Sequence, residues 1–145
     1  LLIMGRFEGS KGLSIDVEHE INNNKNIIYL GFVQNLEKYY YLMDVLIFPT
    51  YREGFGNVSI QAQAAGVPVI TTNATGAKDT VIDQVTGFIV PVKNVNAIVK
   101  KITILINNKE LKLKLGKSAR KYVFDNFNPK IIWEGIEKLY QKGNK

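Results

Sequence analysis

Short apolar runs alternate with helix-like stretches over the first two thirds of the chain. The apolar runs, which are strand candidates, span residues 1–4, 27–32, 45–49, 67–71 and 87–90. The helix candidates between them fall at 14–22, 35–43, 57–65 and 77–82. Short apolar runs bounded by turn residues are typical of parallel strands buried on both faces. The repetition predicts a doubly wound, Rossmann-like α/β sheet of about five strands with right-handed crossovers.

From Asn94 onward the pattern is helical only. Apolar residues recur at helical spacing from 98 to 105, and a second helix is predicted over 110–127. A third is predicted from "NPKIIWEGIEKLYQK", which opens with a capping Asn and a Pro in the first turn. We expect these C-terminal helices to pack across the sheet. Because no linker composition separates them from it, residues 1–145 are predicted to form a single domain.

The composition narrows the class of protein. A length of 145 residues with 46% hydrophobic residues suits one domain with its own core. No apolar run approaches the roughly 18 residues that span a bilayer, so we expect a soluble or at most peripheral protein. The absence of cysteine excludes disulfides, thiolate metal sites and cysteine nucleophiles. The first residues, "LLIMGRF", do not start with Met and show no leader pattern, so we expect a cytoplasmic piece of a longer protein.

The net charge of +6 is unevenly distributed. Residues 1–92 hold six Lys or Arg and nine Asp or Glu, whereas residues 93–145 hold thirteen and four. A basic excess of this kind can mark an anionic partner, either nucleic acid or acidic lipid. It is also the pattern of ordinary solvated helix faces. One hypothesis is that these helices bring the protein to the anionic inner face of the cell membrane.

Several catalytic sets are missing from the sequence. The single histidine, His19, lies in the polar stretch "DVEHEINNN", where a solvent-facing helix residue is expected. There is no Asp-x-Asp pair, no His-Glu-x-x-His and no cluster with metal-ligand spacing, so no metal site is predicted. A phosphate-binding loop of the G-x-x-x-x-G-K-[ST] type is absent as well.

The stretch "FPTYREGFGN" is the strongest candidate for a ligand site. It follows a predicted strand and leads into a helix expected to begin near Asn57, a good capping residue. In doubly wound sheets, ligands bind beyond the carboxyl ends of the strands. Gly54 and Gly56 leave the backbone amides uncovered, and the positive end of a helix favours a phosphate there. A lone G-x-G before a helix is nevertheless a weak signal.

Glu53 gives this loop a second chemical feature. Its carboxylate could accept hydrogen bonds from sugar hydroxyls. The alternative is an ordinary loop carboxylate paired with Arg52.

The longer stretch "FPTYREGFGNVSIQAQAAGVPVITTNATG" resembles the donor-domain signature of family 4 retaining glycosyltransferases, the "glycosyl transferases group 1", which have the GT-B fold. The resemblance continues in "IIYLGFV" and "GAKDTVIDQVTGFIVP" and covers roughly residues 26–92. It implies transfer of a sugar from a nucleotide diphosphate sugar to a glycan or lipid-linked acceptor. It further implies retention at the anomeric carbon, no metal or other cofactor, and a role in bacterial polysaccharide biosynthesis.

The resemblance assigns roles to two positions. In the family, two glutamates with seven residues between them hold the donor, the first at the sugar and the second at the ribose. The first corresponds to Glu53, the catalytic-site candidate, which would orient the sugar and is not a proven nucleophile. The second corresponds to Gln61, whose amide offers one acceptor and one NH₂ donor where a carboxylate offers charge-assisted acceptors. The alternative is that Gln61 points elsewhere.

The remaining donor contacts also follow from the resemblance. They are the phosphate-binding amides of Gly54, Phe55, Gly56, Asn57 and Val58, the base-binding loop of Gly31, Phe32 and Val33, and the cleft residues Thr75 and Gly76. Gly31 also has a simple turn explanation. Residues 73–79 could equally be a plain loop with a capping role.

The segment "GRFEGSKG" resembles the family's phosphate-binding G-R-x-x-x-x-K-G element, but its spacing argues against that role. Only 26 residues separate Gly5 from Gly31, which leaves room for one strand-helix-strand unit, not two. We therefore align "LLIMG" with the following strand of the family. On this alignment we expect Arg6 and Lys11 to be surface residues of a loop. The first strand and helix of the donor domain, and the acceptor-binding domain, are expected outside this chain, which alone would be inactive.

Two other functions remain open. One is a non-catalytic module that binds a nucleotide or nucleic acid through the basic helices, although no recognition motif accompanies them, and we expect no nucleic acid partner. The other is a GT-B nucleotide-sugar epimerase, which would need acid and base residues that the sequence does not offer.

Overall fold

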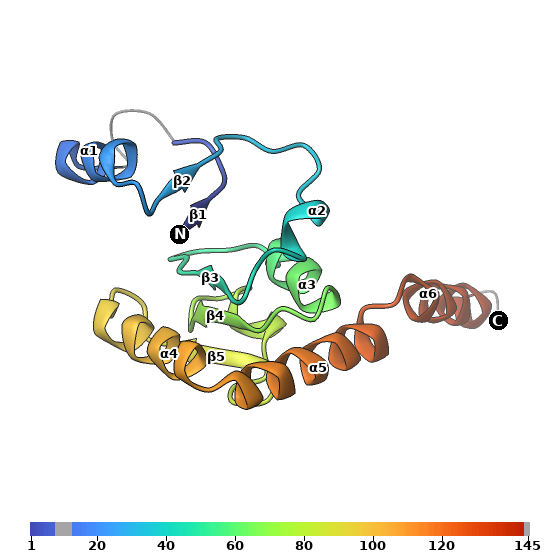
Figure 1. Cartoon of the computed structure of the whole chain (residues 1–145). Helices are drawn as coiled ribbons and strands as arrows, with labels where there is room; N and C mark the ends of the chain where they lie inside the picture. The colour runs from blue at the N-terminus through green and yellow to red at the C-terminus, as the bar shows by residue number, and fades with distance from the viewer. Residues whose placement is uncertain (8–12, 144–145) are drawn as a thin grey trace. The chain divides into compact units, whose positions relative to one another are not determined.

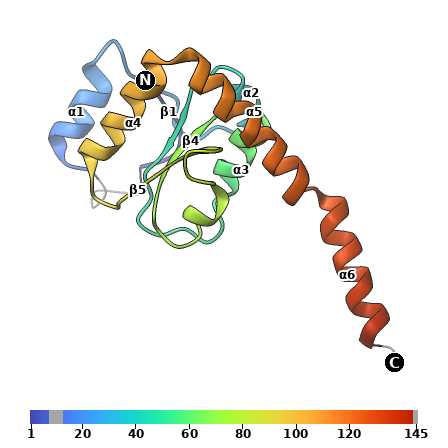
Figure 2. The same cartoon turned by 90° about the horizontal axis from the view of Figure 1, so that it is seen from below.

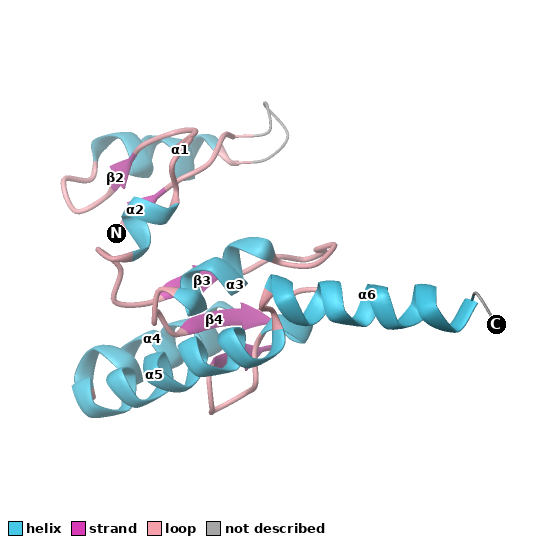
Figure 3. Ribbon diagram, turned by 90° about the vertical axis from the view of Figure 1, so that its right-hand side faces the viewer, coloured by secondary structure: helices cyan, strands magenta, loops and turns pink. Residues whose placement is uncertain are grey.

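A computed structural model describes residues 1–7 and 13–143 of the chain. They fall into two compact units, residues 1–36 and residues 37–145, and each is described by itself. All five predicted strands are present, and every strand pair is parallel (Figures 1 and 3). The strands pair within the units, as a sheet of two and a sheet of three. The α/β prediction is confirmed, while the single domain over 1–145 stays a prediction.

The first unit is one strand-helix-strand crossover. It consists of β1 (Leu2–Ile3), α1 (Ile15–Asn23) and β2 (Ile28–Tyr29). The Ser14 side chain caps α1 by accepting from the Val17 amide at 3.4 Å. His19 is exposed on this helix, as predicted. The strand predicted over 27–32 stops early because Gly31 takes a left-handed conformation with φ of 64°.

The second unit holds a three-stranded sheet in the order β3-β4-β5. Its elements up to the last strand are α2 (Glu37–Tyr40), β3 (Leu46–Phe48), α3 (Asn57–Ala64), β4 (Val69–Thr72), the 3₁₀ helix η2 (Lys78–Thr80) and β5 (Gly87–Val90). Ile70 of β4 lies between Ile47 of β3 and Phe88 of β5. The sequence order and the parallel pairing match the predicted crossovers.

Two predicted helices are shorter than expected. The helix predicted over 35–43 is a single turn, because the amides of Leu42 and Met43 bond back three residues and end it in tight turns. The helix predicted over 77–82 is only η2, because the hydroxyl of Thr80 donates to the carbonyl of Ala77 at 2.8 Å and Val81 is already extended.

Three helices complete the chain, as predicted: α4 (Val95–Asn107), α5 (Lys109–Asn126) and α6 (Pro129–Gly143). Asn94 and Asn108 cap the first two by accepting from the amides of Ala97 and Leu111, at 2.9 and 2.8 Å. Helices α4 and α5 contact β5, so the expectation that the C-terminal helices pack on the sheet is confirmed for these two.

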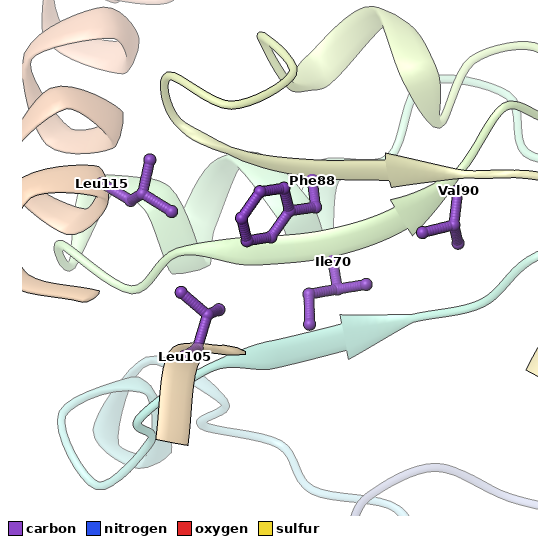
Figure 4. Close-up of a cluster of buried hydrophobic side chains, with 5 residues drawn as sticks. All are labelled: Ile70, Phe88, Val90, Leu105 and Leu115. Atoms are coloured by element: carbon purple, nitrogen blue, oxygen red, sulfur yellow. The ribbon is translucent and has the colours of Figure 1, made fainter. Parts of the chain in front are cut away.

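The core of the second unit lies between the sheet and helices α4 and α5. Ile70, Phe88 and Val90 of the sheet meet Leu105 of α4 and Leu115 of α5 (Figure 4). Burying a side chain of this size stabilises a fold by about 1.5–3 kcal/mol. This cluster therefore fixes the strands whose carboxyl ends carry the candidate site.

Helix α5 also passes close to α3 (Figures 1 and 2). The contact is made backbone to backbone, because a Cβ atom built on Gly116 of α5 would lie 2.2 Å from the carbonyl oxygen of Gly66. Only a residue without a side chain permits this approach.

Candidate functional site

The loop that leaves β3 is held by hydroxyl groups of the neighbouring strand. Thr71 of β4 donates to the carbonyl of Phe48 at 3.0 Å, and Thr72 donates to the carbonyl of Thr50. Thr50 in turn donates to the carbonyl of Arg52 at 2.9 Å. The two β4 threonines are buried, so this part of the loop has a fixed path where it departs from the carboxyl edge of the sheet.

Helix α3 starts at the end of this loop without a side-chain cap. Gly56, not Asn57, is the capping residue, and its φ of 74° and ψ of 44° are left-handed. The expectation that Asn57 caps the helix is therefore wrong by one position, because the chain needs a glycine to turn here. Within the described residues, the amides of Asn57 and Val58 donate to no protein acceptor. Free amides at a helix start attract an anion.

The loop that follows β4 and contains Gly76 lies against the loop that leaves β3. Gly76 has a φ of 81°, and a Cβ atom at this position would lie 2.2 Å from the carbonyl oxygen of Glu53 and 2.6 Å from that of Gly54. The amide of Gly76 donates to Asp79 at 3.1 Å. Thr75, the residue before, is exposed. The structure thus brings Gly76 to the loop around Glu53, while the role of Thr75 and Gly76 as cleft residues stays a prediction.

Glu53 is half-buried within this arrangement. Its Oε1 atom accepts from the amide of Gly54 at 3.1 Å. Among the described residues it forms no ion pair, so the alternative in which it pairs with Arg52 is not realised. The carboxylate keeps lone pairs that can accept hydrogen bonds from hydroxyl groups of a ligand.

Gln61 has a partner that the sequence did not predict. The hydroxyl of Tyr40 donates to the Oε1 atom of Gln61 at 3.0 Å. Tyr40 is 2% exposed, and this burial, followed by the charge of Glu37, raises the pKa of its hydroxyl to about 12. The hydroxyl therefore stays protonated as a donor. Gln61 itself is exposed, and the bond from Tyr40 orients its amide and leaves the NH₂ group available to donate to a ligand.

A buried polar cluster ties α3 to η2 behind the site. The side chain of Gln63 donates to the carbonyl of Thr80 at 2.7 Å and to the hydroxyl of Ser59 at 3.2 Å. The hydroxyls of Ser59 and Thr80 are hydrogen-bonded to each other at 2.8 Å. All three side chains are fully buried. This cluster fixes the loop carrying Gly76 relative to the helix that starts at Gly56.

Phe55 connects the site to the C-terminal helices. Its ring packs edge-on against Phe127 at 5.9 Å, and Phe127 packs likewise against Tyr122 at 5.5 Å. The glycine-rich loop is therefore supported from α5 as well as from the sheet.

The three predicted base-binding residues, Gly31, Phe32 and Val33, belong to the first unit. The amide of Gly5 donates to the carbonyl of Gly31 at 2.8 Å, and the left-handed φ of Gly31 fits the simple turn explanation. The guanidinium of Arg6 lies 4.8 Å from the centre of the exposed Phe32 ring. Arg6 is exposed, as predicted, and Lys11 lies outside the described residues.

Two further properties bear on the chemistry available. Among residues 1–7 and 13–143, no three His, Cys, Asp or Glu side chains gather where they could hold a metal ion. None of the helices that the structure describes combines the length and apolar character required to cross a bilayer.

Comparisons with known proteins agree on one family. The model of "Glycosyl transferases group 1" matches residues 1–122. The chain is 44% identical over 140 residues to the capsular polysaccharide biosynthesis glycosyltransferase CapM of Staphylococcus aureus, which covers 97% of this chain and 37% of CapM. It is 25% identical over 142 residues to an N,N'-diacetylbacillosaminyl-diphospho-undecaprenol alpha-1,3-N-acetylgalactosaminyltransferase of Campylobacter jejuni, covering 98% and 36% of the two chains.

The fold is shared with part of a longer protein whose structure has been solved. The Anabaena protein HepE, crystallised in complex with UDP-glucose, matches with a TM-score of 0.85 at 19% identity, covering 97% of this chain and 40% of HepE. This chain thus spans between a third and a half of the length of the relatives it matches.

Proposed function

Because this chain belongs to the glycosyl transferases group 1 family, we propose that it forms most of the donor-binding domain of a retaining, metal-independent glycosyltransferase of the hexosyltransferase type. The observation that carries this proposal is the contact of Gly76 with the backbone of Glu53 and Gly54, beside the uncapped start of α3. That contact brings a carboxylate and free amides to one edge of the sheet.

The proposed chemistry divides the donor between these groups. The diphosphate binds the amides of residues 54–58, that of Gly54 after it leaves the Glu53 carboxylate, because the helix start favours negative charge. These amides stabilise the negative charge that develops on the leaving nucleotide as the bond to the sugar breaks. Glu53 accepts hydrogen bonds from the sugar hydroxyls and orients the ring. No catalytic metal or other cofactor is required by this scheme.

In the proposal, Gln61 contacts the ribose and residues 31–33 contact the base. Gln61 donates its NH₂ group to a ribose oxygen, and Tyr40 holds the amide in that orientation. Gly31, Phe32 and Val33 hold the base. Thr75 also contacts the donor in this proposal, beside Gly76.

The acceptor is proposed from the relatives. Their names refer to capsular polysaccharide biosynthesis and to a diphospho-undecaprenol acceptor. We therefore assign this chain to polysaccharide biosynthesis with a glycan or lipid-linked acceptor, in the cytoplasm at the inner face of the membrane. Acceptor contacts belong to the other domain of the full protein, so residues 1–145 alone bind the donor without transferring the sugar.

Donor titration by calorimetry tests this function. We expect Glu53→Gln to weaken binding of UDP-glucose or another accepted nucleotide sugar about 10- to 100-fold, because it removes charge-assisted hydrogen bonds of about 1.5–3 kcal/mol. Binding of the nucleotide diphosphate alone should change by less than about threefold, since it does not involve the sugar. The exposed neighbour Arg52→Gln is the matched control and should leave both affinities unchanged.

Equal affinities for wild type and Glu53→Gln would contradict the assignment. Steeply salt-dependent binding to nucleic acid, without binding of nucleotide sugars, would instead favour the nucleic-acid module.

Position 61 gives a second prediction. We expect Gln61→Glu to preserve or tighten nucleotide binding, because one carboxylate oxygen can accept from Tyr40 while the other accepts from the ribose hydroxyls. Calorimetry with the nucleotide diphosphate measures the change. Gln84→Glu, in an exposed turn, introduces the same charge elsewhere and controls for net charge. A large loss of affinity in Gln61→Glu alone would remove this residue from the ribose site.

A further inference from the structure

The side of α5 that points away from the protein carries an unusual mixture of side chains. We call it the outer face of α5, and it consists of Leu113, Lys114, Lys117, Arg120, Lys121 and Phe124. At about 100° per residue these positions fall within one arc of the helix. The buried residues of α5, which include Leu115, Ala119 and Val123, lie on the opposite side. The outer face is therefore not used by the fold.

Two large apolar side chains lie on this face among four cations. Leu113 is 62% exposed and Phe124 is 70% exposed. A single exposed apolar residue is ordinary, but the two lie three turns apart along the same line of the helix, with Lys117 and Arg120 between them. A solvated helix face explains the cations and leaves the two apolar residues without a role.

A groove of about 740 Å³ extends this face. Ala64, Val123, Phe127 and Pro129 contribute apolar atoms to it, and Lys117 and Arg120 lie at its wall. Lys121 also lines the groove but is paired with Asp125 at 2.7 Å, which reduces the positive charge there. Apolar surface is thus continuous with cationic side chains on one side of the second unit.

We propose that the outer face of α5 docks on an anionic lipid surface. Phe124 and Leu113 enter the boundary between headgroups and acyl chains, while Lys114, Lys117 and Arg120 meet the lipid phosphates. This combination of apolar insertion and cationic attraction is how helices lie in a membrane interface. The basic excess of residues 93–145 supports a negatively charged partner, and the apolar pair favours lipid over nucleic acid.

This docking would bring the site to the surface where a lipid-linked acceptor resides, a consequence that rests on the proposed function. The docking itself does not depend on that function, because none of the outer-face residues belongs to the candidate donor site. An experiment can therefore refute the docking without refuting the donor-binding function, and the reverse.

Co-sedimentation with vesicles tests the docking. We expect binding to vesicles of phosphatidylcholine mixed equally with phosphatidylglycerol and little binding to phosphatidylcholine alone. Lys117→Gln with Arg120→Gln should weaken binding to the anionic vesicles about 25-fold, since each lost cation lowers it roughly fivefold. Phe124→Ser should weaken it about tenfold through lost apolar insertion. Unchanged thermal unfolding would show that these exposed substitutions leave the fold intact.

A matched double variant separates position from charge. Lys25→Gln with Lys38→Gln removes two exposed cations outside α4–α6 and should retain at least half of the vesicle binding. Equal losses in the two double variants would overturn the proposal, as would equal binding to neutral and anionic vesicles. Full displacement by duplex DNA together with wild-type binding by Phe124→Ser would assign the face to nucleic acid instead.

Discussion

Replacing Gly76 by alanine is expected to weaken nucleotide-sugar binding at least about tenfold and to cost about 2–4 kcal/mol of unfolding free energy. The φ of 81° is unfavourable for any residue with a side chain, and the new Cβ would lie 2.2 Å from the backbone oxygen of Glu53. A flexible side chain could turn aside from the new Cβ, but a backbone oxygen cannot. The whole loop of Glu53 and Gly54 must therefore move. Urea denaturation and donor titration measure the two losses.

Gly54 provides the control for the loss of stability. A Cβ atom at Gly54 has no neighbour within 4 Å, and its φ is not in the left-handed region. Gly54→Ala should therefore change the unfolding free energy by less than about 1 kcal/mol. Wild-type stability and donor affinity in Gly76→Ala would show that the two loops are not in contact.

Gly116→Ala is expected to destabilise the protein although alanine is the better helix former. Intrinsic propensity alone would favour alanine by about 1 kcal/mol in the middle of α5. The added Cβ would lie 2.2 Å from the carbonyl oxygen of Gly66, so α5 must shift away from α3. We expect a net loss of about 2–4 kcal/mol in urea denaturation, because overpacking against backbone exceeds the gain in propensity.

An exposed position on the same helix tests the reason for this loss. Lys114→Ala also places alanine in α5 but removes no close contact, so its stability should lie within about 0.5 kcal/mol of the wild type. A Gly116→Ala variant as stable as the wild type, or more stable, would contradict the close packing of α5 on the turn that follows α3.

The order of strands and helices could be predicted because each strand is a short apolar run between turn residues. The positions where strands and helices end could not be predicted as well, since they depend on single conformations. Gly31 ends β2 by turning left-handed, and the side-chain hydrogen bond of Thr80 keeps η2 to one turn. Local patterns indicate elements, whereas such endings are fixed by individual residues and their contacts.

The candidate site shows the same division. The proximity of Glu53 and Gly76 could be predicted because both follow the carboxyl ends of strands, where loops of a parallel sheet converge. Tyr40 could not, because its bond to Gln61 joins residues 21 positions apart, and an aromatic residue in a short helix gives no signal beyond burial. Gln63 likewise has no sequence feature that distinguishes its buried role from the exposed role of Gln61.

The proposed function depends most on the binding of a nucleotide diphosphate by the amides at the start of α3. Backbone amide chemical shifts of the ¹⁵N-labelled protein, followed while uridine diphosphate is added, test it most directly. We expect the largest changes at residues 54–58 and at Gly76, whose loop contacts them. Largest changes at the cations of α5, with none at residues 54–58, would contradict it.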